Sequence, residues 1–311
     1  MKRYQIIKTW SFSALLGLGV TSVGFAQQDP QYTQYMYNHA NINPAYAGSL
    51  DALTVYGQYR TQWVGLEGAP KTANLSVTSP IGDSGLGVGV HFSNDQVGVM
   101  KDNSFAIDLS YAIYLNQTYQ LAFGIKGSGN LLDVDYSRLH VFNPSDPVTQ
   151  TNVDNKFTPN IGAGVFLYSD KAYVGFSIPN FLTTTRYDDN TISTMRQQMH
   201  YYLTGGYVFD INPTWKFKPA VLLKAVQGAP LQVDLSANVL FREKVTLGLA
   251  YRWDASVSAL VGFQITKGLF IGYNYDMETT KLAHYNGGSH EFLIRFQLFN
   301  SLKRTNAPRF F

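Results

Sequence analysis

The chain of 311 residues contains no cysteine. This absence excludes disulfide bonds, thiolate metal sites and cysteine nucleophiles. It also excludes a lipoprotein anchor, because that anchor needs a cysteine at the start of the mature chain. We therefore expect neither a disulfide framework nor thiol chemistry.

Charged residues are scarce as well. Only 14% of the residues are charged, and the mean hydropathy is −0.11 although 45% of the residues are hydrophobic. This combination is unusual for a soluble enzyme and is typical of strands whose apolar residues alternate with small polar ones between lipid and lumen. The net charge of +3 is spread along the chain, so no nucleic-acid partner is expected.

Sequence patterns of catalytic and metal sites are also missing. The six histidines do not fall at metal-ligand spacing, and no HExxH motif occurs. His284 and His290 share a loop region with Glu291, but loop histidines are commonly only solvated. The glycines of residues 85–89 lie in an alternating strand with no helix start after them, which argues against a phosphate loop. No Ser–His or Asp–His constellation can be assembled, so we expect no catalysis, no metal and no cofactor.

Residues 1–26 are predicted to be a cleavable signal peptide. An apolar run over residues 10–25 follows three basic residues, Lys2, Arg3 and Lys8. Gly24 and Ala26 supply small residues at positions −3 and −1, which predicts cleavage after Ala26. A membrane anchor is disfavoured because the run contains several Ser, Thr and Gly and no basic stop follows it. The mature chain would then begin at Gln27 and be exported.

Residues 27–50 are predicted to form an N-terminal periplasmic plug or cap. The stretch reads QQDPQYTQYMYNHANINPAYAGSL and carries four tyrosines with almost no charge. It is too aromatic for a solvated linker, and it is too polar and too short to cross a membrane as a helix. The candidates for plugging or partner contact are Tyr32, Tyr35, Met36, Tyr37, Asn38, Asn43, Pro44, Tyr46 and Gly48.

A short helix is predicted inside this stretch. Asp29 and Pro30 form a helix-start signal. Four residues after it fall on one helical stripe: Tyr32, Tyr35, Met36 and His39. Asparagines and a proline then break the pattern, and a second short turn from Pro44 would end at Gly48.

Fourteen transmembrane strands are predicted from Leu53 onward, because the dominant period there is two. Most have the ~9–11 residues that a tilted strand needs to cross a bilayer. Short turns alternate with longer connections, as in outer-membrane barrels. The predicted strands are 53–63, 70–79, 84–95, 103–115, 117–129, 158–169, 171–179, 199–210, 212–224, 229–242, 244–254, 256–266, 268–278 and 288–298.

The fold class expected is therefore all-β: a single antiparallel transmembrane β-barrel over residues 51–299, followed by a basic periplasmic tail at 300–311. A β-sandwich is disfavoured because one face of these strands is consistently apolar. The opposite face carries charges, which would need partners or water in a lumen. These are Arg60, Asp108, Lys126, Lys216, Lys218, Asp234, Arg252, Asp276, Glu291 and Arg295. A salt-bridge network in a plugged lumen is favoured over a weakly anion-selective pore.

Two short motifs carry a resemblance to a known family. The segments Tyr35-Met36-Tyr37-Asn38 and Asn43-Pro44-Ala45-Tyr46-Ala47-Gly48 follow a leader and precede a barrel that ends in SHEFLIRFQLF. This layout closely resembles the PorP/SprF family of the type IX secretion system. The resemblance implies an outer-membrane protein that assists secretion and gliding. It also implies several partners: outer-membrane lipid, secreted adhesins with C-terminal sorting domains, a PorE-like peptidoglycan-binding protein and a PorK/PorN-like ring.

A second family shares part of this pattern. Asn43-Pro44-Ala45 after an N-terminal hatch also resembles long-chain fatty-acid transporters, which are plugged barrels of fourteen strands. That resemblance implies an apolar pocket in the lumen and a longer chain. The charged lumen predicted here ranks the transporter second, and the plug-like stretch disfavours a general solute porin.

Overall fold

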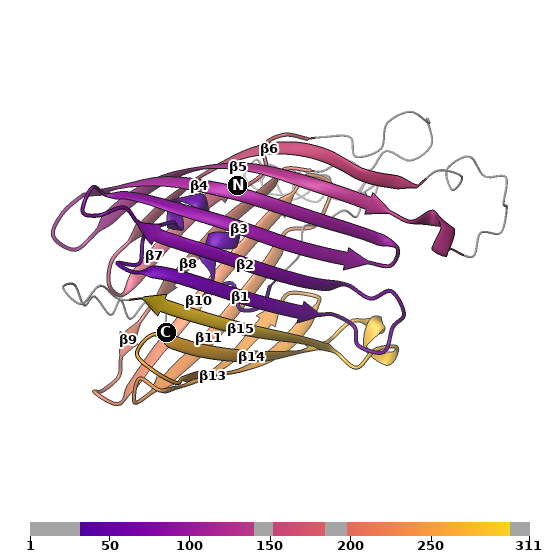
Figure 1. The fold of residues 1–311 in the computed structure, drawn as a ribbon. Helices are drawn as coiled ribbons and strands as arrows, with labels where there is room; N and C mark the ends of the chain where they lie inside the picture. The colour runs from indigo at the N-terminus through magenta and orange to yellow at the C-terminus, as the bar shows by residue number, and fades with distance from the viewer. Residues whose placement is uncertain (1–31, 140–151, 184–197, 299–311) are drawn as a thin grey trace, which may run out of the picture.

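The alternating segments form long strands that pair edge to edge around a single closed sheet (Figure 1). The computed structural model describes residues 32–139, 152–183 and 198–298. The strands are β1 (Leu53–Thr61), β2 (Lys71–Pro80), β3 (Leu86–Val97), β4 (Met100–Tyr114), β5 (Gln120–Val134), β6 (Val153–Tyr168), β7 (Ala172–Ile178), β8 (His200–Tyr207), β9 (Phe209–Asp210), β10 (Trp215–Val226), β11 (Gln232–Phe241), β12 (Val245–Arg252), β13 (Ser256–Gln264), β14 (Leu269–Glu278) and β15 (Ser289–Leu298).

Pairing between the first and last strands closes the barrel. Leu53 of β1 lies opposite Leu298 of β15. All described pairings are antiparallel, and apart from this closing pair and the β8–β10 pair they join consecutive strands. Both β8 and β9 pair with β10, and only Val208 separates them. They therefore act as one strand, and the fifteen segments make a fourteen-stranded barrel. The predicted all-β, fourteen-strand barrel is confirmed.

The two faces of the sheet differ sharply in chemistry. Adjacent residues of a strand point to opposite faces, so Ile107 is 55% exposed on the outside while Asp108 is fully buried in the lumen. Ile125 and Leu249 are likewise exposed at 62% and 64%. An apolar outer surface with a polar interior is the pattern of barrels that face lipid.

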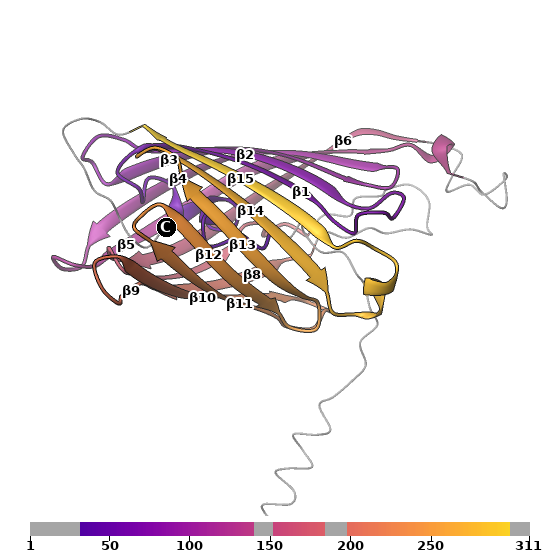
Figure 2. The same cartoon turned by 90° about the horizontal axis from the view of Figure 1, so that it is seen from below.

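The two ends of the barrel also differ. Short connections lie at one end, called the turn end here: 81–85, 115–119, 169–171, 211–214, 242–244 and 265–268. The two longest connections, 135–152 and 179–199, lie at the opposite loop end. The β5–β6 hairpin with η3 (Tyr136–Arg138) extends beyond the other strands at the loop end, where η5 (Lys281–His284) also lies (Figure 2).

The N-terminal segment, residues 32–50, lies inside the barrel rather than beside it (Figure 1). Turns occupy residues 33–37 where part of the short helix was expected, and two 3₁₀ helices follow, η1 (His39–Asn41) and η2 (Pro44–Tyr46). Turns replace the helix because the backbone N–H groups of residues 33 and 34 donate to a strand carboxylate. The second predicted turn is present as η2. Asp29 and Pro30 lie outside the described residues.

The hydrophobic core of the molecule sits in the lumen. Tyr37 and Tyr46 of the N-terminal segment pack with Phe166, Tyr173 and Phe270 from the barrel wall, all at most 2% exposed. The described part of the chain contains no helix long and apolar enough to cross a membrane. The predicted signal peptide (1–26) and basic tail (300–311) lie outside the described residues.

Candidate functional site

The N-terminal segment runs through the lumen from the loop end toward the turn end. Gly48 lies against Gly87 and Pro80, which border the β2–β3 turn. Thr33 lies beside Glu291 and Asp276, near the loop ends of β15 and β14. The segment therefore spans much of the barrel interior before the chain enters β1.

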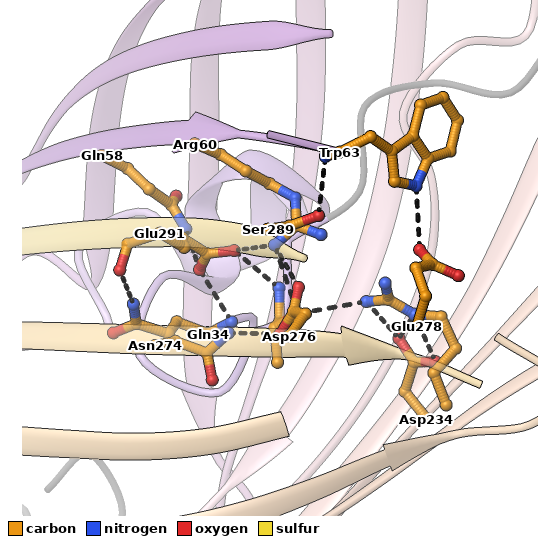
Figure 3. Close-up of polar contacts among 12 residues, drawn as sticks. Gln34, Gln58, Arg60, Trp63, Asp234, Asn274, Asp276, Glu278, Ser289 and Glu291 are labelled. Carbon is orange, nitrogen blue, oxygen red and sulfur yellow. Dashed lines mark hydrogen bonds and ion pairs between the residues drawn. The ribbon is translucent and has the colours of Figure 1, made fainter. Parts of the chain in front are cut away.

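Glu291 of β15 is the main anchor of this segment (Figure 3). Its carboxylate accepts hydrogen bonds from the backbone N–H groups of Thr33 and Gln34, each at 2.9 Å. The same carboxylate accepts from Gln58 Nε2 and from Arg60 Nη1, again at 2.9 Å. Because Glu291 is fully buried, these charge-assisted hydrogen bonds replace the water that its charge requires.

A second carboxylate extends the anchor. Asp276 Oδ2 lies 2.5 Å from Arg60 Nη1 and accepts a hydrogen bond from Thr33 Oγ1 at 2.9 Å. Asp276 also accepts from Asn274 Nδ2. One guanidinium thus sits between two carboxylates and beside the N-terminal segment, so the loss of any member leaves a buried charge uncompensated.

Arg252 and Asp234 form a neighbouring ion pair. Arg252 Nε lies 3.0 Å from Asp234 Oδ1, and Arg252 Nη2 lies 3.2 Å from Asp234 Oδ2. Arg252 Nη2 also donates to Thr33 Oγ1 at 3.5 Å, and Tyr35 Oη donates to the carbonyl oxygen of Asp234 at 3.4 Å. The structure thus brings five of the predicted lumen charges around the start of the segment: Arg60, Asp234, Arg252, Asp276 and Glu291.

A separate polar cluster lies on the wall formed by β3, β4 and β5. Asp108 lies 2.8 Å from His91 Nε2 and 3.6 Å from Lys126 Nζ. His91 Nδ1 lies 3.0 Å from Ser76 Oγ. Sequence reasoning identified Asp108 and Lys126 but missed His91. The available signal was the period of two: His91 precedes Ser93 and Asp95 by two and four residues, so all three point to the same polar face of the strand.

The remaining predicted charges take other positions. Lys218 is fully buried with its ammonium 4.9 Å from the ring centre of Tyr37, and Arg295 lies 5.1 Å from the ring centre of Phe270. Both arrangements are cation–π contacts. Lys216 lies at the turn end and pairs at 3.0 Å with the exposed Glu243. It therefore stands apart from the buried clusters.

The second motif of the segment binds the opposite wall through backbone and amide groups. Asn43 Nδ2 donates to the carbonyl of Val165 at 3.1 Å, while Asn43 Oδ1 accepts from the N–H of Ala45 at 3.0 Å. Ser110 Oγ donates to the carbonyl of Ala47 at 2.5 Å. The hydroxyl groups of Tyr46 and Tyr56 lie 2.7 Å apart. Asn43 therefore both caps η2 and fixes it to β6.

The first motif is buried among aromatic side chains. Tyr37 stacks on Phe270 with ring centres 5.2 Å apart, and Met36 and Asn38 are only 1% and 2% exposed. Burial raises the pKa of the Tyr35 and Tyr37 hydroxyls, so both stay neutral. Tyr32 lines a lumen cavity together with residues such as His91 and Lys126.

Three strand glycines make room for the segment. A Cβ at Gly87 would overlap the carbonyl of Ala47, and a Cβ at Gly124 would overlap the backbone of Ala45. A Cβ at Gly164 would overlap the side chain of Asn43. Close backbone approach is a recognised reason for glycine inside a strand. Sequence reasoning considered the glycines of residues 85–89 only as a candidate phosphate loop and missed this complementarity.

The arrangement is suited to holding a chain segment. Among the residues that the structure describes, no group of three or more His, Asp or Glu side chains could hold a metal ion. His39 is buried with its ring centre 4.7 Å from that of Tyr173, and His290 Nδ1 lies 2.7 Å from the hydroxyl of Tyr273. These histidines therefore take part in packing and hydrogen bonding within the barrel.

Comparison with solved structures shows the porin-like fold. The chain is similar to the CymD monoaromatic hydrocarbon channel, with a TM-score of 0.50, 11% identity, and coverage of 91% of this chain and 96% of the channel. It is also similar to the NanC porin (TM-score 0.43, 13% identity, 80% and 100% covered) and to a Pseudomonas aeruginosa FadL homologue (TM-score 0.41, 12% identity, 86% and 94% covered).

Comparison with protein families is more specific. No curated protein matches the chain. The family model described as "Type IX secretion system membrane protein PorP/SprF" matches residues 24–296. That match spans the N-terminal segment and nearly all of the barrel. The chain therefore belongs to the PorP/SprF family of type IX secretion system membrane proteins.

Proposed function

We propose that this protein is a non-catalytic outer-membrane component of the type IX secretion and gliding apparatus. It assists the secretion or surface attachment of cargo, such as adhesins with C-terminal sorting domains. The observation that carries this proposal is the family match over residues 24–296. The apolar outer face of the barrel supports a place in the outer-membrane lipid.

The N-terminal residues 27–50 act as a plug in this proposal. The support is the burial of residues such as Met36, Tyr37 and Tyr46, together with the hydrogen bonds that join Thr33 and Gln34 to Glu291. The plug candidates of both motifs thus fill the lumen. They could contact a partner only if the segment left the barrel.

The turn end faces the periplasm in this proposal. A leader cleaved after Ala26 delivers the chain there, and the basic tail at 300–311 follows β15, which ends at that side. The turn end and tail are then the surfaces open to periplasmic partners, which we propose to be a PorE-like peptidoglycan-binding protein and a PorK/PorN-like ring. Short periplasmic turns and longer outer loops are the usual arrangement in such barrels.

Deletion of the gene tests the secretion role. The proposal predicts that adhesins with C-terminal sorting domains fail to reach the cell surface, and that the wild-type chain restores them. Complementation by Ile113→Leu, a conservative change on the outer face, provides a matched positive control because Ile113 is 37% exposed. Unchanged surface adhesin and unchanged gliding in the deletion strain would overturn the proposal. Lost uptake of fatty molecules with normal export would instead support the transporter.

A further inference from the structure

One sector of the turn end carries a row of aromatic rings that crosses β8 to β11. The row consists of Tyr207, Phe209, Phe217, Trp215 and Phe241. Ring centres lie 4.6 Å apart for Tyr207 and Phe209, 6.3 Å for Phe209 and Phe217, and 4.5 Å for Trp215 and Phe241. Their chain neighbours Val208, Lys218 and Leu240 are buried, so the rings point outward. Outward aromatic rings at the end of a barrel form a girdle at the membrane interface.

Arg242 extends this row toward the water. Its guanidinium carbon lies 5.1 Å from the ring centre of Phe241, which is a cation–π contact. Because the Phe241 ring points outward, the guanidinium lies on the lipid side of the barrel rim. The backbone N–H of Arg242 donates to the carbonyl oxygen of Thr214 at 2.8 Å, which fixes the β11–β12 turn beside the β9–β10 turn.

Two lysines continue the cationic stretch along the rim. The backbone N–H of Gln264 donates to the carbonyl oxygen of Lys244 at 2.7 Å, and Gln264 Nε2 donates to that of Lys267 at 3.5 Å. The β11–β12 and β13–β14 turns are therefore neighbours. Together they present three exposed cations, Arg242, Lys244 and Lys267.

These three cations differ from the other cations of the same sector. Lys171 Nζ lies 2.6 Å from Asp210 Oδ2, and Lys216 Nζ lies 3.0 Å from Glu243 Oε1. Within the described parts of the chain, Arg242, Lys244 and Lys267 form no ion pair with an acidic side chain. Their positive charge is therefore available to a partner.

The rest of the turn end has the opposite character. The connections 81–85 and 115–119 contain no lysine or arginine, and the first of them carries Asp83. Asp51 precedes β1 at the same end. The described turn end is thus polarised, with its unpaired cations concentrated above the sector that also carries the aromatic row.

This combination is complementary to a lipid with an anionic headgroup. The aromatic rings lie at the level where acyl chains meet headgroups, and the cations lie beyond them, at the level of phosphate groups. An acidic soluble protein would satisfy the cations but would leave the aromatic row without a role. The two features together therefore favour a lipid.

We propose that this sector binds an anionic phospholipid in the leaflet at the turn end. Arg242, oriented by the Phe241 ring, donates hydrogen bonds to the headgroup phosphate, and Lys244 and Lys267 add charge attraction. The aromatic row packs along the upper acyl chains. This inference rests on the proposed place of the barrel in outer-membrane lipid, and it adds which lipid the barrel selects and where.

Quenching of Trp215 fluorescence tests the selection. The protein is purified from membranes and reconstituted into phosphatidylcholine vesicles. These contain either dibrominated phosphatidylglycerol or dibrominated phosphatidylcholine at the same mole fraction, because bromine quenches a tryptophan in contact with it. The difference from Trp215→Phe gives the share of Trp215 in the signal. We expect the brominated phosphatidylglycerol to quench Trp215 more strongly than the brominated phosphatidylcholine.

Removal of the cations should abolish this preference. Attraction of one basic side chain to an anionic headgroup layer is worth a roughly fivefold change in binding. The triple variant Arg242→Gln, Lys244→Gln and Lys267→Gln should therefore lower the ratio of the two lipid-binding constants at least about fivefold. The matched control is Lys71→Gln, Lys101→Gln and Lys281→Gln. It removes three exposed cations from the loop end, changes the net charge equally and should keep the preference.

Three outcomes would overturn the proposal. Equal quenching of Trp215 by the two lipids in the wild-type protein would do so, and would leave the three cations to a soluble acidic partner. A preference that survives in the turn-end variant, or one that the loop-end variant loses equally, would do the same. Heat-modifiable migration on a gel identifies the folded barrels. The measurement uses purified protein in vesicles, so its failure would leave the secretion role untouched.

Discussion

The backbone N–H of Gln34 donates a hydrogen bond to Glu291 Oε1 at 2.9 Å, and Gln34 Nε2 donates to the carbonyl oxygen of Glu291 at 3.2 Å. These residues are 257 positions apart. The contact joins the N-terminal segment to β15, which also pairs with β1 to close the barrel. The buried carboxylate of Glu291 therefore holds the N-terminal segment in the lumen, and Glu291 itself belongs to the strand that closes the barrel.

Gly124→Ala tests the close approach of the segment to β5. The new methyl group would overlap the backbone of Ala45, and overpacking of this kind costs about 1–3 kcal/mol. We expect a lower midpoint of urea unfolding for the folded protein. The matched control is Gly127→Ala on the same strand, because a Cβ there meets no atom within 4 Å. Equal midpoints for the two variants would contradict this packing.

Arg60→Met and Glu291→Gln test the buried anchor as a double-mutant cycle. Removing one partner of a buried ion pair costs about 3–5 kcal/mol because the other charge remains. We expect the double variant to lose less free energy of unfolding than the sum of the singles, with a coupling of about 0.5–3 kcal/mol. Urea unfolding provides the measurement.

A second pair serves as the control for this cycle. Lys216 Nζ and Glu243 Oε1 lie 3.0 Å apart, close to the 2.9 Å of the anchor pair, but the Glu243 side chain is 68% exposed at the turn end. Exposed pairs couple by at most about 1 kcal/mol, so Lys216→Met with Glu243→Gln should be nearly additive. Additivity at Arg60 and Glu291 as well would show that the anchor is not energetically coupled.

Ile125→Arg tests the outer face of the barrel. Ile125 is 62% exposed near the middle of β5. An arginine on the lipid face costs about 2–4 kcal/mol at the bilayer midplane and about 0–1 kcal/mol near the interface. Tyr114→Arg, at the turn end of β4 and 76% exposed, is the interfacial control. The free energy of unfolding from lipid bilayers should fall more for Ile125→Arg than for Tyr114→Arg. Equal losses in the two variants would contradict the assignment of the middle of β5 to the lipid core.

Sequence alone predicted the barrel because its signal is local. The period of two along each strand determines which side chains face outward, as Ile107 and Asp108 illustrate. The fourteen predicted strands match the observed ones with shifts at their ends. The aromatic, nearly uncharged composition likewise indicated that residues 27–50 form a plug or cap rather than a solvated linker.

The contacts inside the lumen could not be predicted from the sequence. These contacts join different strands, or join the N-terminal segment to a strand. They include the hydrogen bonds from residues 33 and 34 to Glu291, the close approach of Ala45 to Gly124, and the contact of His91 with Asp108. They depend on strand register and on the path of the segment through the barrel. Neither is encoded in a local pattern, so the sequence showed which charges face inward but not which ones meet.

Ion conductance across a planar bilayer tests most directly the claim that the N-terminal segment closes the lumen. The wild-type barrel should carry no steady current, because residues such as Tyr37 and Tyr46 fill its interior. A chain lacking residues 32–47 but still heat-modifiable on a gel should conduct as an open pore. A wild-type barrel that conducts steadily, with a current unchanged by the deletion, would contradict the account.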